Sequence, residues 1–194
     1  METIIIHFEG NIGAGKTTKI KNYCIREKNT FCEEVEKWKS TGIFDELYKN
    51  NKSIFFPFQI LTLTSQADIL LNKILGNENK IYCVERSIYS QRIFAELIFK
   101  ENNQMQELAC YNELFNMLET KIKTEQKGKN IFTLYFYLQT SPEECLSNIQ
   151  KRGRVEEQNI TLEYLKKIDE AHKKFFNYKN DFFKNNNNIC LILI

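Results

Sequence analysis

A glycine-rich segment near the N-terminus constrains the fold of this chain more than any other feature. Residues 10–17 read GNIGAGKT, with the spacing G-x-x-x-x-G-K-T, and they follow the apolar run Thr3–Phe8. A strand, a glycine-rich turn and the start of an amphipathic helix form a loop whose backbone N–H groups converge on phosphate oxygens. The pattern therefore predicts a nucleoside triphosphate site at the end of an N-terminal strand.

Each residue type in this loop suits a triphosphate. Lys16 would reach the β- and γ-phosphates, and the Thr17 hydroxyl would help to hold Mg²⁺. The positive end of the helix dipole near Lys16 adds to the attraction. The predicted nucleotide-binding residues of the loop are Gly10, Asn11, Gly13, Ala14, Gly15, Lys16, Thr17 and Thr18. The alternative is a glycine-rich turn with a surface lysine, and the position directly after an apolar strand disfavours it.

Composition narrows the class of protein. The chain has 194 residues, 42% of them hydrophobic, which is enough for one globular domain with a sizeable core. A net charge of +2 gives no electrostatic footprint for nucleic acid or a membrane surface. No stretch is expected to span a membrane and no signal peptide precedes the first strand, so the expected location is the cytoplasm.

The cysteines and histidines argue against a metal centre built from them. The six cysteines are scattered without a C-x-x-C pair, and the chain has only two histidines. A zinc site or a disulfide framework is therefore not expected. The cysteines are predicted to be reduced thiols, most of them in the core of a cytosolic protein.

Apolar runs alternate with helical patterns along the chain. Beyond the first strand, the predicted strands are Thr30–Cys32, Lys80–Val84, Phe132–Leu138 and Ile189–Ile194. The predicted helices are 16–28, 41–50, 54–75, 88–100, 104–126, 142–152 and 161–183. This alternation predicts an α/β fold with a five-stranded parallel sheet flanked by helices, in which ligands bind at the carboxyl ends of the strands. No linker divides the chain, so residues 1–194 are expected to form a single domain.

Charged residues follow two of the predicted strands where they end. Glu33 comes directly after one strand, and Glu85 and Arg86 come after the next. A carboxylate can accept the proton of an alcohol, an arginine can offset charge on a transferred group, and a second acid can hold Mg²⁺ through water. Together with the phosphate loop, these residues predict phosphoryl transfer to a hydroxyl group.

A basic cluster follows the fourth predicted strand. Residues 151–158 read KRGRVEEQ, and Gly153 breaks the preceding helix between Arg152 and Arg154. This pattern is typical of a lid, expected at about 148–158, that closes arginines over phosphates. By itself it is equally compatible with an exposed helix end whose cations favour the dipole.

These motifs resemble those of the deoxynucleoside kinases, the group that includes deoxycytidine, deoxyguanosine and mitochondrial thymidine kinases and the insect multisubstrate enzyme. The matching stretches are EGNIGAGKTT (9–18), the E-x-V-x-x-W pattern from Glu33 to Trp38, FPFQ (56–59), ERSIYS (85–90), YLQTSPEECL (137–146) and RGRVEEQNITLEYL (152–165). They occur in the order of the family and with similar spacing. The resemblance implies a P-loop kinase fold with an arginine-rich lid, and ATP with Mg²⁺ as phosphate donor.

The resemblance also implies roles for the residues at matching positions. Glu33 matches the general base for the sugar 5′-hydroxyl, Arg86 the arginine that steadies the reacting oxygen and phosphate, and Glu85 the acid of the magnesium site beside Thr17. Tyr48 and Glu157 match the pair that binds the sugar 3′-hydroxyl. Arg152 and Arg154 match lid arginines on ATP, and Lys16 acts with Arg86 in catalysis.

The base pocket is implied in the same way. Gln59 matches the glutamine whose amide pairs with the base edge, because an amide offers both an acceptor and two donors. Trp38 and Phe58 match aromatic walls of this pocket. Plain core packing remains an alternative for Phe58, because aromatic side chains commonly fill cores.

Three departures from the family pattern bear on specificity. Gln66 and Gln91 stand where members that prefer purines and deoxycytidine carry an arginine and an aspartate, which favours thymidine and other pyrimidines; the two glutamines could also bond each other. Asn148 stands where the first lid arginine is usual. The sequence also ends on its last predicted strand at Ile194, where many members continue into a loop that touches the donor base. Both leave the phosphate donor preference open.

Other functions remain possible on these residues. A thymidylate kinase shares the glycine-rich loop and the lid, but it needs a further arginine for the acceptor phosphate, and Glu157 is placed for a hydroxyl instead. A nucleotide-switched binding protein or an inactive subunit is disfavoured because five residues expected in the site are present together: Lys16, Thr17, Glu33, Glu85 and Arg86. By resemblance, the chain is expected to form a homodimer through helices near 54–75 and 88–120.

Overall fold

The computed structural model describes residues 2–27, 30–33, 41–48, 51–75, 80–177, 180–186 and 188–194. The side chains of residues 30–33, 44, 45, 48 and 156 are not among those described.

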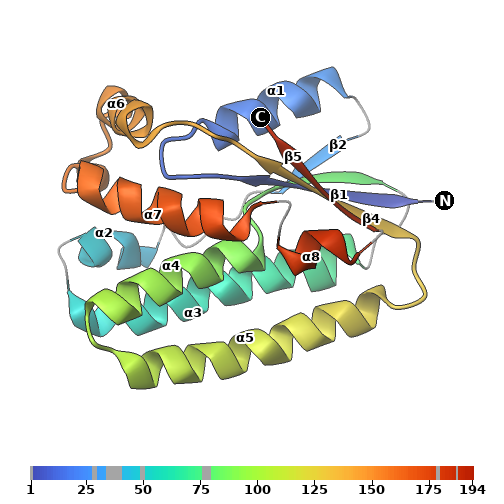
Figure 1. Cartoon of the computed structure of the whole chain (residues 1–194), viewed down its shortest axis with the longest axis horizontal. Helices are drawn as coiled ribbons and strands as arrows, with labels where there is room; N and C mark the ends of the chain where they lie inside the picture. Colours follow the sequence, from blue (N-terminus) through green and yellow to red (C-terminus); the bar gives the residue numbers. More distant parts are fainter. Residues whose placement is uncertain are drawn as a thin grey trace.

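A parallel sheet forms the centre of the molecule (Figure 1). Its five strands lie in the order β2-β3-β1-β4-β5. Their bounds are β1 Thr3–Glu9, β2 Thr30–Glu33, β3 Ile81–Glu85, β4 Ile131–Tyr137 and β5 Ile189–Leu193. The predicted α/β fold with a five-stranded parallel sheet is confirmed. Because β1 lies between β3 and β4, the glycine-rich loop begins at the middle of the sheet edge.

Helices cover both faces of this sheet. The bounds are α1 Lys16–Arg26, α2 Ile43–Tyr48, α3 Lys52–Asp68, the π-helical turn η2 Ile69–Ile74, α4 Ile88–Glu101, α5 Met105–Gln126, α6 Pro142–Arg152, the 3₁₀ turn η3 Val155–Glu157, α7 Leu162–Phe175 and α8 Asp181–Lys184. Figure 1 shows α1 and α6 on one side of the sheet, with α3, α4 and α5 on the other. Parallel strands buried on both faces explain why their sequences read as apolar runs.

Alternate residues of β1 supply the two main hydrophobic cores. Ile5 packs with residues of α3, η2, α4 and α5. Ile6 and Phe8 point to the other face and pack with Ile20 of α1 and Ile149 of α6. The period of two along β1 therefore connects both helical layers to the strand that carries the glycine-rich loop.

The predicted helix 161–183 is two helices. α7 ends at Phe175, and the Asn177 amide donates to the carbonyl of Lys173 at 3.3 Å and also to that of Lys174. Asn180 then caps α8 by accepting from the backbone N–H of Phe182 at 3.0 Å. Asparagine side chains compete for backbone groups in this way, so they end one helix and start the next.

The continuous helix Lys52–Ile74, formed by α3 and η2, is an exception to the expectation that no stretch of this chain approaches a membrane span. By length and composition alone it is apolar enough to cross a bilayer, which is weak evidence for a span. Half of its most apolar window is buried inside the fold, and the helix packs against α2, α4 and α5. Its apolar composition follows from this inner position in the helical layer.

The cysteines match the expectation only in part. Cys83, Cys110, Cys145 and Cys190 are free thiols, whereas Cys24 on α1 is disulfide-bonded. The prediction of reduced thiols is therefore wrong for Cys24. Spacing along the sequence carries no signal for such a bond, because the fold decides which thiols meet.

Candidate active site

The loop between β1 and α1 depends on glycine for steric reasons. Gly13 has a positive φ of 78°, and a Cβ atom there would lie 2.4 Å from the carbonyl oxygen of Cys145. Gly15 has a φ of 87°, with open space around the position of a Cβ. The loop is thus pressed against α6 at Gly13 and turned into α1 at Gly15, as a phosphate-binding loop requires.

The first turn of α1 is free to bind an anion. Its N-cap is Gly15, which has no side chain to accept from the backbone N–H groups, and the first turn holds no acidic residue. Unsatisfied N–H groups and the positive end of the helix dipole therefore face the loop. This is the arrangement that binds phosphate groups at helix N-termini.

The side chain of Lys16 lies between the loop and the end of β3. Its side chain is 4% exposed, its Nζ donates to the carbonyl of Asn11 at 2.7 Å, and the Oε1 of Glu85 lies 3.8 Å away. Burial, and secondarily the nearby Arg86, lowers the pKa of Lys16 to about 7. A triphosphate would restore the charged form by supplying the negative charge that burial lacks.

Two asparagine side chains connect the loop to neighbouring helices. The buried Asn11 amide donates to the carbonyl of Leu165 on α7 at 2.8 Å, and its Oδ1 accepts from the N–H of Ile12 at 2.8 Å. Asn148 of α6 donates to the carbonyl of Gly13 at 2.9 Å. Asn148 therefore contacts the loop backbone, and Asn11 uses its side chain to hold the loop in shape.

Thr17 and Glu85 meet as the sequence predicts. The Thr17 hydroxyl donates to Oε2 of Glu85 at 2.7 Å. A hydroxyl and a carboxylate are hard oxygen ligands of the kind Mg²⁺ prefers, and the remaining positions are commonly filled by water and substrate phosphates. Within the described part of the chain, no group of three or more His, Cys, Asp or Glu side chains forms a metal site by itself. The two side chains therefore fit a magnesium site completed by the nucleotide.

Arg86 follows β3 and reaches back to the same loop. Its Nη1 donates to the carbonyl of Gly10 at 2.9 Å, and its guanidinium carbon lies 4.5 Å from the centre of the Phe94 ring. The parallel register pairs Phe8 with Glu85, which places the end of β3 beside the start of the loop. Topology thus brings Lys16, Glu85 and Arg86 together.

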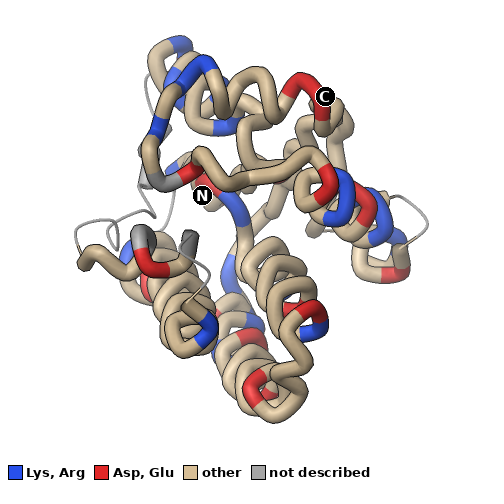
Figure 2. The backbone as a smooth tube through the Cα atoms, turned by 90° about the vertical axis from the view of Figure 1, so that its left-hand side faces the viewer, with Lys and Arg blue, Asp and Glu red and all other residues tan. Residues whose placement is uncertain are grey.

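The two arginines of the predicted lid contact the same acid. Arg152 Nη2 bonds to Oε2 of Glu157, and Arg154 Nη1 lies 3.4 Å from Oε1 of the same carboxylate, which is nearly fully buried. Gly153 ends α6 in a left-handed conformation and sets the two arginines on either side of the turn. Figure 2 shows the run of basic residues at the end of α6 and in the turn after it, at the upper left.

The predicted base-pocket residues on α3 and α4 are buried and uncharged. Phe58, Gln59, Gln66 and Gln91 are at most 7% exposed. The Oε1 atom of Gln59 is buried without a hydrogen-bond partner among the described residues. Gln66 donates through Nε2 to the carbonyl of Arg86 at 2.7 Å, and no described bond joins it to Gln91.

Three predicted residues have side chains outside the described set. The backbone of Glu33 ends β2 and pairs with Val84 in the register, which places it at the same sheet edge as the loop. The backbone of Tyr48 ends α2. Trp38 lies outside the described residues altogether.

A buried polar chain beside the site is absent from the sequence predictions. Glu9, Ser90 and His172 are fully buried. Ser90 donates to Oε2 of Glu9 and lies 3.5 Å from Nε2 of His172, whose Nδ1 donates to the carbonyl of Ile168. Burial raises the pKa of Glu9 and lowers that of His172 to about 3. The only local signal is an acid at the end of an otherwise apolar strand.

Comparison with known proteins identifies the family of this chain. The family model described as "Deoxynucleoside kinase" matches residues 6–192. Human deoxycytidine kinase is 30% identical, over 88% of this chain and 74% of the relative. The mitochondrial deoxyguanosine kinase of Xenopus laevis is 26% identical, over 100% of this chain and 82% of the relative.

A solved structure supports the fold in the same way. The deoxyadenosine kinase from M. mycoides, with dCMP and dCDP bound, superimposes with a TM-score of 0.72 at 23% identity, over 98% of this chain and 88% of that chain. The family model covers nearly the whole chain, including the glycine-rich loop and the acid and arginine at the end of β3. This chain belongs to the deoxynucleoside kinase family, a family of ATP-dependent phosphotransferases.

Proposed function

We propose that this kinase transfers the γ-phosphoryl group of ATP, with Mg²⁺, to the 5′-hydroxyl of thymidine and other pyrimidine deoxynucleosides. The observation that carries the proposal is the meeting of three strand ends at one edge of the sheet. The loop after β1, the backbone of Glu33 on β2, and the end of β3 with Glu85 and Arg86 lie at this edge. Phosphoryl transfer needs hydrogen-bond donors that bind the phosphate groups, a base for the acceptor hydroxyl, and a cation that offsets the charge of the transferred group.

The triphosphate would lie on the loop and the first turn of α1. Lys16 would exchange the carbonyl of Asn11 for phosphate oxygens, and Arg152 and Arg154 would leave Glu157 for the phosphates when the lid closes. Thr17 and Glu85 would hold Mg²⁺, which supplies charge neutralisation on the donor phosphates when bound.

The acceptor would lie across the same sheet edge. Glu33 would take the proton of the 5′-hydroxyl, and Arg86 would stabilise the charge that develops on the transferred group. Tyr48 and Glu157 would bind the 3′-hydroxyl, which requires Glu157 to exchange its arginine partners for the sugar. This exchange links lid closure to acceptor binding.

The pyrimidine preference rests on the uncharged pocket. The unpartnered Oε1 of Gln59 can accept from thymine N3–H while the Gln59 amide donates to a neighbouring carbonyl of the base. An unpaired buried acceptor is costly, so a ligand N–H is a favourable partner. Phe58 and Trp38 would flank the base. Gln66 and Gln91 add polarity without charge, which disfavours recognition that depends on an arginine and aspartate pair.

Deoxycytidine is the second candidate acceptor. The curated relatives include deoxycytidine kinases of chicken, cow, mouse and human. A rotated Gln59 amide can donate to N3 of cytosine and accept from its amino group, so the same side chain suits both pyrimidines.

The acceptor base is tested by steady-state assays with ATP and Mg²⁺ on thymidine, deoxycytidine, deoxyadenosine and deoxyguanosine. We expect kcat/KM for thymidine to be at least about tenfold above that for either purine deoxynucleoside. A purine would leave one buried polar group of the pocket unpaired, and that loss corresponds to about tenfold in kcat/KM. Higher turnover of deoxycytidine than of thymidine would select the second candidate. A purine as the best acceptor would overturn the interpretation of the uncharged pocket.

The role of Glu33 is tested by Glu33→Gln. Loss of the base should lower kcat by about 10²- to 10⁴-fold while ATP still binds, measured by single-turnover kinetics and calorimetry. Glu27→Gln on the exposed end of α1 is the matched control and should keep kcat. Full activity of Glu33→Gln would remove Glu33 from the mechanism.

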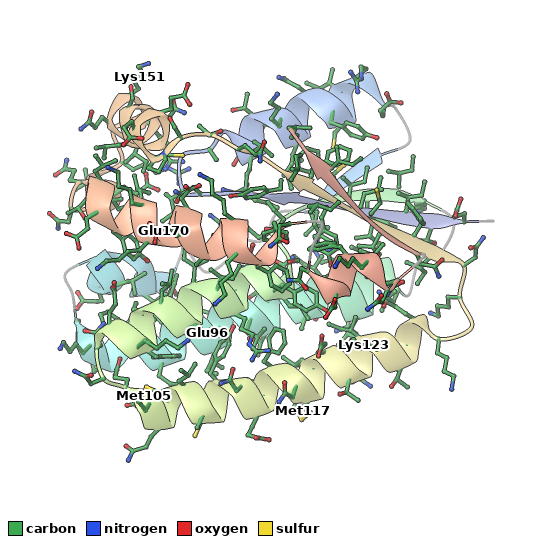
Figure 3. All side chains as sticks on the ribbon, in the orientation of Figure 1. Glu96, Met105, Met117, Lys123, Lys151 and Glu170 are labelled. Carbon is green, nitrogen blue, oxygen red and sulfur yellow. The ribbon has the colours of Figure 1, made fainter. Side chains whose placement is uncertain are left out.

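We also infer a homodimer that packs through α4 and α5. Met105 and Met117 of α5 are 57% and 61% exposed, and Figure 3 shows Met117 on the side of α5 that faces away from α4. Covering such side chains is favourable. Light scattering should give a dimer for the wild type and a monomer for Met117→Lys. Ile25→Lys, on an apolar residue of α1 that is 79% exposed, should stay dimeric, and a monomeric wild type would contradict the inference.

A further inference from the structure

Arg86 adopts a backbone conformation that residues with a Cβ rarely take. Its φ is +66°, in the left-handed region where glycine and asparagine are favoured. Such a conformation persists at a functional site when surrounding contacts hold it. An arginine here gives a guanidinium that points at the glycine-rich loop, so the contacts that hold its backbone also determine where that guanidinium lies.

Hydrogen bonds hold the peptide groups on both sides of the Arg86 Cα. Its N–H donates to the carbonyl of Phe8 on β1 at 3.0 Å. Its carbonyl oxygen accepts twice, from Nε2 of Gln66 on α3 at 2.7 Å and from Nδ1 of His7 on β1 at 3.0 Å. The two lone pairs of one carbonyl are therefore filled by two side chains from different elements.

His7 is committed to the donor role. A carbonyl oxygen can only accept, so Nδ1 of His7 carries the proton in this contact. The side chain is 3% exposed, and burial lowers the pKa of His7 to about 4, so the ring is neutral. Its ring stacks on Tyr135 of β4 at 5.1 Å, which fixes the direction of the Nδ1–H bond.

Gln66 also contacts the Arg86 carbonyl, but this position leaves its own amide oxygen unpaired within the described part of the chain. It is fully buried, and its Oε1 has no hydrogen-bond partner among the described residues. A side chain selected only for packing at this position would avoid an unpaired buried acceptor. The amide proton that reaches Arg86 accounts for a polar side chain here.

We propose that His7 and Gln66 are positioning residues for phosphoryl transfer: together they hold the carbonyl of Arg86, and so keep its guanidinium at the start of the phosphate loop. The proposal rests on the proposed function, because it requires Arg86 to act on the transferred group. It gives Gln66 a role toward the arginine in addition to the base pocket. His7 does not need to touch either substrate, and this role of Gln66 depends on its contact with the Arg86 carbonyl alone.

The test removes each donor and keeps the shape. His7→Phe preserves the ring that stacks on Tyr135, and Gln66→Met preserves chain length. Each should lower kcat about 3- to 10-fold with the KM for ATP changed less than about twofold, as the loss of one net hydrogen bond predicts. The double variant should lose more than either single variant. His7→Asn, whose amide nitrogen can occupy the place of Nδ1, should recover most of kcat.

A second set of variants distinguishes a role in positioning the Arg86 guanidinium from a role in stabilising the fold alone. In an Arg86→Lys background the guanidinium that His7 would position is gone, so adding His7→Phe should leave the residual kcat unchanged. Tyr111→Phe, which alters another fully buried side chain, on α5, is the control and should keep wild-type kcat. A lowered melting temperature with unchanged kcat in His7→Phe and Gln66→Met would overturn the proposal.

The same experiment distinguishes this inference from the proposed function. Arg86→Lys alone should lower kcat by about 10²-fold or more, as removal of a transition-state donor does. If Arg86→Lys keeps wild-type kcat, the proposed role of Arg86 fails. If Arg86→Lys loses activity while His7→Phe and Gln66→Met keep it, only the positioning role fails.

Discussion

The buried Lys16 ammonium makes nucleotide binding depend on pH. Its pKa is lowered to about 7, mainly by burial, while phosphate oxygens bind the charged form. Above pH 7 the free protein must take up a proton to bind ATP, so affinity should fall by up to about tenfold per pH unit between pH 7 and 9. Calorimetry at pH 8 in buffers of different ionisation enthalpy should show uptake approaching one proton. Lys19→Met, on the exposed side of α1, should leave this uptake intact, and a pH-independent affinity would contradict the account.

Gly13 and Gly15 allow a matched comparison of steric clash with backbone strain. A Cβ at Gly13 meets the Cys145 carbonyl oxygen at 2.4 Å, whereas nothing lies within 4 Å of a Cβ at Gly15, and both have positive φ. Gly15→Ala should therefore cost about 1–2 kcal/mol of unfolding free energy from strain alone. Gly13→Ala should cost clearly more, because α6 must shift. Urea unfolding measures both, and equal costs would show that the loop does not press on α6.

At the scale of elements, both arginines of the proposed lid at about 148–158 contact Glu157. Glu157→Gln removes the charge that would bind the sugar 3′-hydroxyl. This variant should therefore lower kcat/KM for thymidine by about tenfold or more. The wild type should therefore prefer thymidine over 3′-deoxythymidine by a similar factor. The variant should treat the two acceptors alike, and Glu163→Gln on exposed α7 should behave as wild type. A preference retained in Glu157→Gln would assign the hydroxyl to another residue.

For the whole molecule, two buried histidines predict loss of stability in mild acid. The pKa values of His7 and His172 are lowered by burial to about 4 and 3, so both bind fewer protons in the folded state than in the unfolded state below pH 6.5. The stability they contribute is present above pH 6.5 and is lost as pH falls toward 4. Between pH 7 and 5 each should cost about 2 kcal/mol, from roughly 1.4 kcal/mol per pH unit below 6.5.

Urea unfolding at pH 7 and pH 5 checks this dependence. His172→Phe should remove about half of the loss in unfolding free energy between the two pH values. The raised pKa of the buried Glu9 acts with the opposite sign, because a folded state that keeps its proton loses stability as pH rises, so it offsets part of the effect. Equal unfolding free energies at pH 5 and 7 in the wild type would contradict the assignment of neutral buried histidines.

The parts of the fold that depend on local sequence patterns were predictable. Apolar runs predict the strands, and the glycine spacing predicts the loop, because each depends on neighbours in the chain. The parallel register then brings Glu85 and Arg86 to the loop. The contact of Gln66 with the Arg86 carbonyl and the chain of Glu9, Ser90 and His172 were not predictable, because they join side chains from separate elements that only packing places together.

The most direct test of the account is the class of acceptor. Purified protein with ATP and Mg²⁺ is offered thymidine or thymidine 5′-monophosphate, and the products are separated by chromatography. The account predicts that thymidine is converted to its 5′-monophosphate and that the monophosphate is not phosphorylated. Phosphorylation of the monophosphate alone would contradict the central claim, and it would remove Glu33 and Glu157 from the roles assigned to them.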